Sequence, residues 1–228
     1  MTTVREFLKR SHALVTLVRL AWSIRSRLAR PRRIRDYLAT NAVRRLQLGA
    51  EGGPLPGWLC VDHRRRGGQV VYLDASRPFP FDDAVFDYIF SEHLIEHFSW
   101  GDGGHMLSEC LRVLRPGGTL RITTPDLASV LSLYDGTDDP GKERYTAWQT
   151  DHLGDTDLRK PQFAINNAFY GYGHQFLYDG EILELALQKA GFAGIARRQC
   201  GESPDPYLHG LDSHMTFVTM AYETKRPD

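Results

Sequence analysis

Three apolar segments of this 228-residue chain end in residues that could hold a small polar ligand. The first ends in a glycine-rich turn, Leu46-Gln47-Leu48-Gly49-Ala50-Glu51-Gly52-Gly53, and the next two end in Asp62 and Asp74. Glycines let a ligand approach the backbone closely. A carboxylate accepts hydrogen bonds from ribose hydroxyls or from an adenine amino group. Three successive strand ends of this kind favour a site for an adenosine-containing ligand.

Two further motifs follow in the chain. They are Pro78-Phe79-Pro80-Phe81-Asp82-Asp83-Ala84-Val85-Phe86-Asp87, continuing to Ser91-Glu92-His93-Leu94-Ile95-Glu96-His97, and Arg112-Val113-Leu114-Arg115-Pro116-Gly117-Gly118. In number, order and spacing these motifs resemble the class I S-adenosylmethionine-dependent methyltransferases. The sequence is most similar to bacterial members associated with polysaccharide and glycolipid biosynthesis, the sugar O-methyltransferase type. The resemblance runs from about Arg45 to Tyr134 and resumes at Phe169.

This resemblance implies a fold and a cofactor. The fold would be a Rossmann-like, doubly wound α/β sheet of seven mostly parallel strands with an antiparallel last strand, and S-adenosylmethionine would lie over the carboxyl ends of the strands. The implied cofactor-binding residues are Gly49, Ala50, Glu51 and Gly52 for the methionine part, Asp62 for the ribose, Asp74 and Ala75 for the adenine, and Ser91, Glu92 and His93 beneath the sulfonium.

The sequence departs from the family pattern at two places. Glu51 stands where the family usually has a second glycine. It is either a tolerated turn variant or a carboxylate that meets the positive amino group of the methionine moiety. The interval from Gly49 to Asp62 is also short and leaves little room for a first crossover helix. Such a short interval disfavours a nicotinamide-binding unit, whose acidic residue comes about 20 residues after the turn.

Methyl transfer to a hydroxyl group requires alignment of the reactants and a base within hydrogen-bond reach. The candidate bases are His93, Asp126, His152 and His174. Asp126 equally suits the cap of a helix. His174 ends the segment Tyr170-Gly171-Tyr172-Gly173-His174, whose aromatic side chains suit a sugar ring. His97, one helical turn after His93, is expected to serve packing or hydrogen bonding.

The acidic run from Asp151 to Asp157 could bind magnesium through oxygen ligands. Its spacing does not match an EF-hand loop, and solvated acidic loops are common. We therefore expect no metal site: magnesium is compatible with this run but is not predicted. His152 becomes a candidate base if the run folds over the cofactor.

The elements that must position these residues fall into two parts. Residues 43–228 show strands alternating with glycine-rich turns and helices, which is typical of a parallel sheet. The expected strands are 44–48, 58–62, 69–73, 85–90, 119–124, 194–200 and 214–223, and the expected helices are 102–114, 126–134 and 179–190. Residues 135–178 are rich in Gly, Asp and aromatics without a clear period, and we expect an insertion or lid at the substrate site.

Residues 1–42 form the second part, a basic amphipathic segment with expected helices at 4–28 and 34–40. Residues 1–45 carry a net charge of +10 and the rest of the chain carries −10. The helix is expected to pack on the domain or on a second copy, which makes a homodimer plausible. Peripheral contact with a membrane surface is the next alternative, and nucleic acid is not an expected partner.

Composition excludes several classes of protein. No segment approaches the roughly 20 apolar residues of a membrane-spanning helix. The longest candidate, Ala13 to Ile24, contains Arg19 and has no cleavage site after it, so no secretory signal is expected. Three isolated cysteines favour a reducing cytoplasm over a disulfide framework.

The leading hypothesis is a methyltransferase that moves a methyl group from S-adenosylmethionine to a carbohydrate hydroxyl. The first alternative is methylation of another small molecule or of a lipid head group. The second alternative is a non-catalytic partner subunit that binds S-adenosylmethionine.

Overall fold

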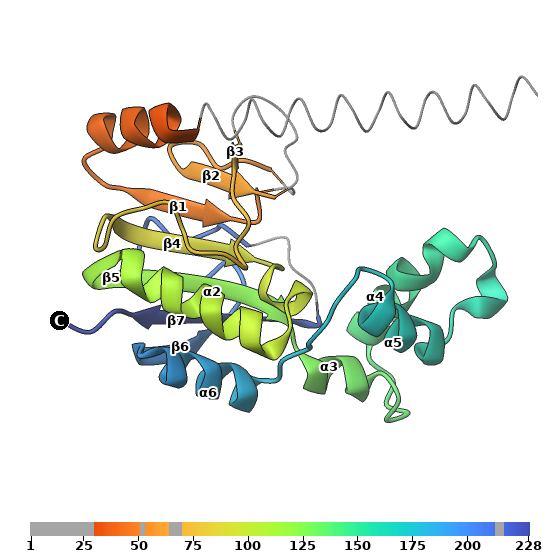
Figure 1. The fold of residues 1–228 in the computed structure, drawn as a ribbon. Helices are drawn as coiled ribbons and strands as arrows, with labels where there is room; N and C mark the ends of the chain where they lie inside the picture. The colour runs from red at the N-terminus through yellow and green to blue at the C-terminus, as the bar shows by residue number, and fades with distance from the viewer. Residues whose placement is uncertain (1–29, 51–52, 64–69, 213–216) are drawn as a thin grey trace, which may run out of the picture.

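The computed structural model describes residues 30–50, 53–63, 70–212 and 217–228. Within them a seven-stranded sheet has the order β3-β2-β1-β4-β5-β7-β6 (Figure 1). The strands are β1 (Arg45–Leu48), β2 (Leu59–Asp62), β3 (Val71–Tyr72), β4 (Phe86–Glu92), β5 (Leu114–Pro125), β6 (Ala193–Arg198) and β7 (Thr219–Lys225). The first five strands pair in parallel, and β7 runs antiparallel to both of its neighbours. This topology confirms the expected Rossmann-like fold.

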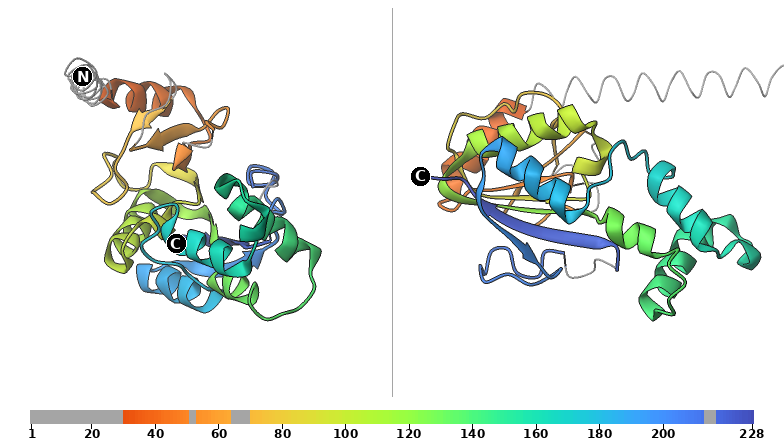
Figure 2. Two further views of the ribbon diagram at one scale, coloured as in Figure 1. Left: turned by 90° about the vertical axis from the view of Figure 1, so that its right-hand side faces the viewer. Right: turned by 90° about the horizontal axis from the view of Figure 1, so that it is seen from below.

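Helices cover one face of the sheet. Residues 30–40, α2 (Trp100–Val113) and α6 (Gly180–Ala190) pack on it and share one apolar core with the strands (Figure 2). Three of the four residues of β1 and four of the seven residues of β4 are buried, as expected for inner strands of a sheet covered on both faces. Each end of α6 has a local cause: the Asp179 side chain accepts a hydrogen bond from Ile182 N, and Gly191 adopts a positive φ of 97°.

The opposite face is covered by the connection between β6 and β7, where Leu208 packs against Phe90. A buried ion cluster holds this connection to β5. Arg121 is fully buried, and its Nη2 donates to both carboxylate oxygens of Asp212 at 2.8 and 2.9 Å. Its Nη1 donates to Glu223 Oε1 on β7 at 2.7 Å. The guanidinium therefore ties two strands and the connection together.

The segment 135–178 contains helices that the sequence pattern did not reveal. They are α4 (Pro140–Thr150) and α5 (Pro161–Tyr170), joined by the 3-10 turns η3 (Asp151–Leu153) and η4 (Thr156–Leu158). With α3 (Leu127–Ser132) they enclose a small core of their own. This group of helices projects beyond the carboxyl ends of the strands (Figures 1 and 2). The overlooked signal is a proline at the start of both α4 and α5, which favours a first helical position.

Several boundaries differ from the expected ones. Strand β5 begins at Leu114 rather than 119, because Pro116-Gly117-Gly118 forms a bulge inside the strand instead of a turn before it. Gly117 has a φ of 74° there. Strand β3 has only two residues, and the helix expected at 126–134 is shorter. The expected short helix at 34–40 lies within the helical residues 30–40. The expected helix at 4–28, together with Glu51 and Gly52, lies outside the described residues.

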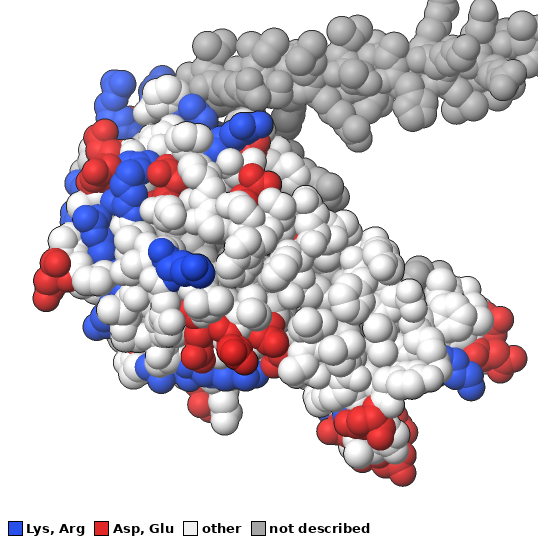
Figure 3. Space-filling model, turned by 60° about the horizontal axis from the view of Figure 1, so that its bottom comes forward, with Lys and Arg blue, Asp and Glu red and all other residues white. Residues whose placement is uncertain are grey.

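Charged side chains are unevenly distributed on the face shown in Figure 3. Lys and Arg gather on the end of the sheet body away from the insertion, and the Asp and Glu side chains of the insertion lie toward its outer ends. None of the helices that the structure describes has the length and apolar character needed to cross a membrane.

Candidate functional site

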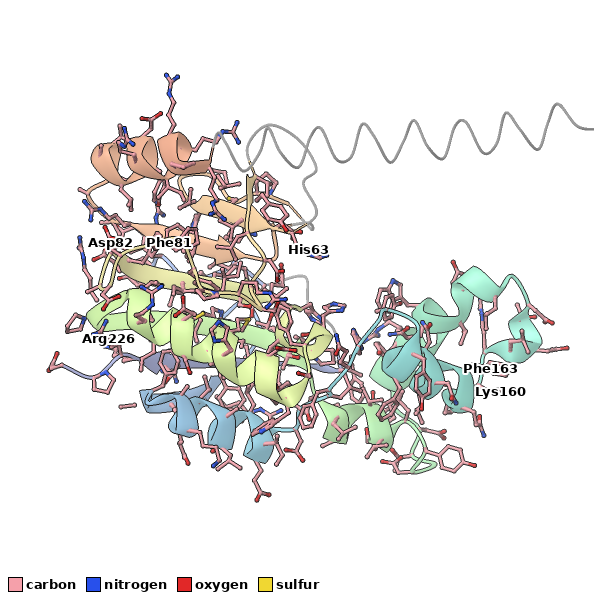
Figure 4. All side chains as sticks on the ribbon, in the orientation of Figure 1. His63, Phe81, Asp82, Lys160, Phe163 and Arg226 are labelled. Atoms are coloured by element: carbon pink, nitrogen blue, oxygen red, sulfur yellow. The ribbon has the colours of Figure 1, made fainter. Side chains whose placement is uncertain are left out.

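A cavity of about 400 Å³ opens at the carboxyl ends of β1, β2, β3 and β4. Strand β1 lies between β2 and β4. The strands that directly follow β1 in the chain, β2 and β3, lie on one side of it, and β4 and β5 lie on the other, so the strand order reverses at β1. Ligands of open α/β sheets bind at such a switch point. Figure 4 shows His63, which lines the cavity, at the end of the sheet that faces the insertion, whereas Phe81 and Arg226 mark the opposite end.

Gly49, Asp62, Asp74 and Ala75 line this cavity, as the resemblance implied for cofactor-binding residues. Gly49 follows β1 with a φ of 73°, and a Cβ there would lie 3.4 Å from the Leu94 Cβ atom. That distance is an ordinary contact, but side chains rarely adopt this positive φ, so the backbone conformation favours glycine, which keeps the backbone open to the cavity.

The two aspartates differ in their surroundings. Asp62 ends β2 and is only 5% exposed, with Nδ1 of His63 lying 3.3 Å from its Oδ1. Asp74 is half-buried, and its Oδ1 accepts hydrogen bonds from the backbone and the hydroxyl of Ser76 at 3.1 and 2.7 Å. Asp74 thus stabilises its own turn while it lines the cavity.

His93 also lines the cavity and lies just after β4 in a strained conformation with a φ of 45°. Its Nδ1 is 3.2 Å from Oε1 of Glu96, and its Nε2 is 3.2 Å from the Thr219 hydroxyl. Glu96 is fully buried, and its Oε2 accepts a hydrogen bond from the Thr124 hydroxyl at 3.0 Å. The imidazole therefore lies between Glu96 and Thr219 of β7, and Thr124 of β5 holds Glu96 in place.

Burial and the charge of the partner shift the pKa values of His93 and Glu96 in opposite directions. Burial alone would lower the pKa of His93, but the adjacent Glu96 carboxylate raises it above its ordinary value. Burial would likewise raise the pKa of Glu96, yet His93 lowers it. The pair favours an imidazolium beside a carboxylate, and a His93 with a raised pKa is a stronger base once it has lost its proton.

His97 and His174 form a second group beside this pair. His97 ends η2 (Ile95–His97), lines the cavity, and packs edge-on against His174, with ring centroids 4.9 Å apart. The sequence pattern gave His97 a packing or hydrogen-bonding role, and the structure adds contact with the cavity. His174 lies beside Tyr172 and Gly173, which line the cavity, and burial lowers the pKa of its imidazole.

The remaining candidate bases lie elsewhere or are not described. Asp126 caps α3 through a hydrogen bond from Ala128 N, and Arg197 Nη2 donates to its other oxygen at 2.8 Å. Asp126 is not among the residues that line the cavity. The backbone of His152 forms part of η3, and its side chain is outside the described atoms.

Three residues that the resemblance implied as cofactor contacts are not among those that line this cavity. Ala50 is 2% exposed and packs in the apolar cluster of Phe90. Ser91 is fully buried, and its Oγ has no hydrogen-bond partner among the described residues. Glu92 is half-buried next to the strained backbone of His93.

Glu96 and an aromatic pair in this region were not predicted as functional from the sequence. Glu96 is the second acidic residue of the Glu-His-x-x-Glu-His motif, and that repeat was the available signal. The aromatic pair is Trp148 of α4 and Tyr172, whose rings are 15° from parallel with centroids 6.4 Å apart. These residues are 24 positions apart, so no local pattern indicates the pair.

Comparisons with known proteins agree with this geometry. Residues 58–122 match the family model described as "Methyltransferase domain". A curated relative from Mycolicibacterium smegmatis, named "Probable S-adenosylmethionine-dependent methyltransferase", is 31% identical over 121 residues, which cover 49% of this chain and 44% of the relative. The match therefore spans less than half of that protein's length.

Two solved structures resemble the chain over most of its length. A methyltransferase from Thermotoga maritima, described as a possible histamine N-methyltransferase, is 16% identical, with 90% and 93% of the two chains covered and a TM-score of 0.49. An S-adenosylmethionine-dependent methyltransferase from Mesorhizobium loti is 14% identical, with 82% and 92% covered and a TM-score of 0.48. The sequence matches cover part of the chain and are to a methyltransferase domain and to a relative named for S-adenosylmethionine, the cofactor that the sequence motifs also imply.

Proposed function

We propose that this chain, whose residues 58–122 match a methyltransferase domain, transfers a methyl group from S-adenosylmethionine to a hydroxyl of a carbohydrate. When bound, this cofactor supplies an electrophilic methyl carbon. The protein then has to hold the cofactor, align the hydroxyl and accept its proton. The described residues offer a group for each of these tasks.

The cavity at the strand ends suits the cofactor. Its volume of about 400 Å³ lies in the range of small-molecule sites. The buried Asp62 carboxylate provides an acceptor for ribose hydroxyls, and Asp74 lies at the next strand end for the adenine. Gly49 leaves the backbone open for the methionine part. The residues present therefore fit the cofactor.

The observation that carries the carbohydrate proposal is the aromatic pair of Trp148 and Tyr172. Both rings remain largely exposed, at 60% and 46%, although they are large and apolar. The Tyr172 hydroxyl donates to Gln149 Oε1 at 3.0 Å, so this ring is fixed before any ligand arrives. Flat, preorganised aromatic surfaces next to a cavity suit the apolar faces of a sugar ring. Tyr172 also lines the cavity, and its contact with Trp148 puts the aromatic pair beside the cavity.

His93 is the base that we favour for the acceptor hydroxyl. In its neutral form with the proton on Nδ1, the ring donates toward Glu96, and Nε2 can accept a proton. Nε2 now lies 3.2 Å from the Thr219 hydroxyl, which an acceptor hydroxyl would replace. Glu96 then acts as a positioning residue that stabilises the protonated imidazole.

The alternatives are methylation of another small molecule or a lipid head group, and a non-catalytic subunit that binds S-adenosylmethionine. Contact with a membrane surface and formation of a homodimer would both use the basic residues 1–42. We propose these two roles for residues 1–42 only. In the same proposal residues 43–228 form the methyltransferase domain, and residues 135–178 are its insertion at the substrate site. A cytoplasmic location is likewise a proposal, carried by the cysteine pattern.

Calorimetric titration with S-adenosylhomocysteine, followed by incubation with labelled donor and separate saccharide, lipid and amine extracts, tests these functions. We expect binding and label transfer to the saccharide fraction. The matched controls are Asp62→Ala, which should lose cofactor binding, and Asp82→Ala, which changes an exposed residue at the other end of the sheet. Binding without transfer to any extract would favour the non-catalytic subunit, and transfer only to lipid or amine would reject the carbohydrate.

A further inference from the structure

Two imidazoles and one carboxylate converge beside the cofactor cavity. The ligand atoms of Glu96, His97 and His174 all lie within 4.8 Å of one another. Two of these residues come from η2, and the third comes from the segment after α5, far along the chain. Imidazole nitrogen and carboxylate oxygen are common ligands of divalent transition metals.

The two segments are held together by their backbones. Gln175 N and Phe176 N donate to the Glu96 carbonyl at 2.8 and 3.2 Å. The Gln175 side chain donates to the His97 carbonyl at 2.7 Å. The three side chains are therefore brought together by hydrogen bonds of the backbone and of Gln175, not by hydrogen bonds to one another.

The hydrogen bonds around the cluster orient it for a cation. His174 Nδ1 contacts the Ala168 carbonyl, which can only accept a proton, so the lone pair of this ring is on Nε2. Metal-binding histidines are commonly oriented by such a bond from their other nitrogen to a carbonyl. Thr124 holds Oε2 of Glu96 in the same way.

The Glu96 carboxylate is the buried anionic member of the cluster. It is fully buried, and no hydrogen bond among the described residues reaches Oε1, although His93 Nδ1 is 3.2 Å away. A buried carboxylate needs positive charge nearby, which the His93 imidazolium supplies in the metal-free protein and to which a metal ion at the cluster would add.

We propose that Glu96, His97 and His174 bind one divalent transition-metal ion of the Zn²⁺ type. Magnesium is disfavoured, because it prefers an all-oxygen octahedral shell. Metal–ligand bonds of about 2.0–2.1 Å place tetrahedral ligands about 3.3 Å apart, so the cluster closes by about 1.5 Å or less on binding. Three protein ligands leave one coordination position open. Since His97 lines the cavity, that position lies next to the cofactor site and, on the proposed function, suits an oxygen of the acceptor.

Zinc chloride titrated calorimetrically into tag-free, chelator-stripped full-length protein tests this site. We expect one Zn²⁺ per chain. His97→Ala and His174→Ala should each weaken binding by more than about 100-fold, because loss of an outer-shell partner alone costs about 10–100-fold. His209→Ala, which changes an exposed histidine far from the cluster in sequence, is the matched control and should bind as the wild type does.

Two further measurements keep the result unambiguous. Thermal unfolding of the metal-free variants checks that they fold, and added Zn²⁺ should raise the midpoint of the wild type and of His209→Ala only. The absorption spectrum of the Co²⁺-loaded protein should show nitrogen and oxygen ligation without thiolate bands, which separates this site from binding at the three free cysteines. Unchanged Zn²⁺ affinity in both histidine variants, or no binding by the wild type at micromolar Zn²⁺, would overturn the proposal. S-adenosylhomocysteine affinity, measured in parallel, reports on the proposed function separately.

Discussion

Replacement of Arg121 by methionine gives the sharpest test of how this sheet is held together. Arg121 is fully buried and donates to Asp212 and Glu223, whose side chains are 0% and 8% exposed. Methionine has a similar length but no charge, so the two carboxylates would stay buried without the guanidinium. Breaking a buried ion pair from one side costs about 3–5 kcal/mol. At about 2–4 °C per kcal/mol, the midpoint of thermal unfolding should fall by about 6–20 °C.

A surface ion pair provides the matched control. Arg115 Nη1 lies 2.7 Å from Asp87 Oδ1, the same distance as between Arg121 and Glu223, but these side chains are 38% and 26% exposed. Solvent screening reduces such a pair to about 0–1 kcal/mol. Arg115→Met should therefore shift the midpoint by only a few degrees, although the substitution and the distance are the same.

The effect of Arg121→Met should also depend on pH. In the wild type burial would raise the pKa of Glu223, but hydrogen bonds from Ser203, Arg198 and Arg121 lower it overall. A carboxylate whose pKa is lower in the folded state stabilises the fold at every pH above its unfolded-state pKa, which is about 4.3 for Glu. This stabilisation is lost as the pH falls through the lower, folded-state pKa. The stability difference between wild type and variant should therefore be largest near pH 7 and shrink below pH 5. Urea unfolding at several pH values measures it, and equal midpoints at pH 7 would refute the reasoning.

Three further predictions concern the site. Asp62→Ala should weaken S-adenosylhomocysteine binding about 100-fold by calorimetry, because it removes two hydrogen bonds to a charged group worth about 1.5 kcal/mol each. If the affinity of Asp62→Ala lies within threefold of that of the Asp82→Ala control, Asp62 does not bind the ribose. Trp148→Ala should raise the KM for the acceptor about 2–10-fold through loss of about 0.5–1.5 kcal/mol of stacking, with cofactor affinity unchanged. Phe163→Ala, another exposed aromatic on the insertion, is its control, and equal effects in steady-state assays would contradict the proposed platform. His93→Gln should lower kcat about 10²–10⁴-fold with little change in S-adenosylhomocysteine affinity, and wild-type kcat would remove His93 as the base.

Local sequence determined the sheet and one side of the cavity. Gly49, Asp62 and Asp74 were predicted at strand ends because each directly follows an apolar run, and parallel strands place their carboxyl ends along one edge. The short interval between Gly49 and Asp62 likewise predicted that β1 and β2 would be joined without a long helix. These features depend on neighbours in the chain, and spacing alone records them.

Only the tertiary structure decided which distant side chains meet. The approach of His174 to Glu96 depends on Gln175 bonding to the backbone of η2, and the pairing of Trp148 with Tyr172 depends on the packing of α4 against α5. Arg121 is fully buried within β5, and its carboxylate partners lie 91 and 102 residues later in the chain. Periodicity reports which face of an element is apolar but not which element will cover it, because that choice is made by the packing of the whole core.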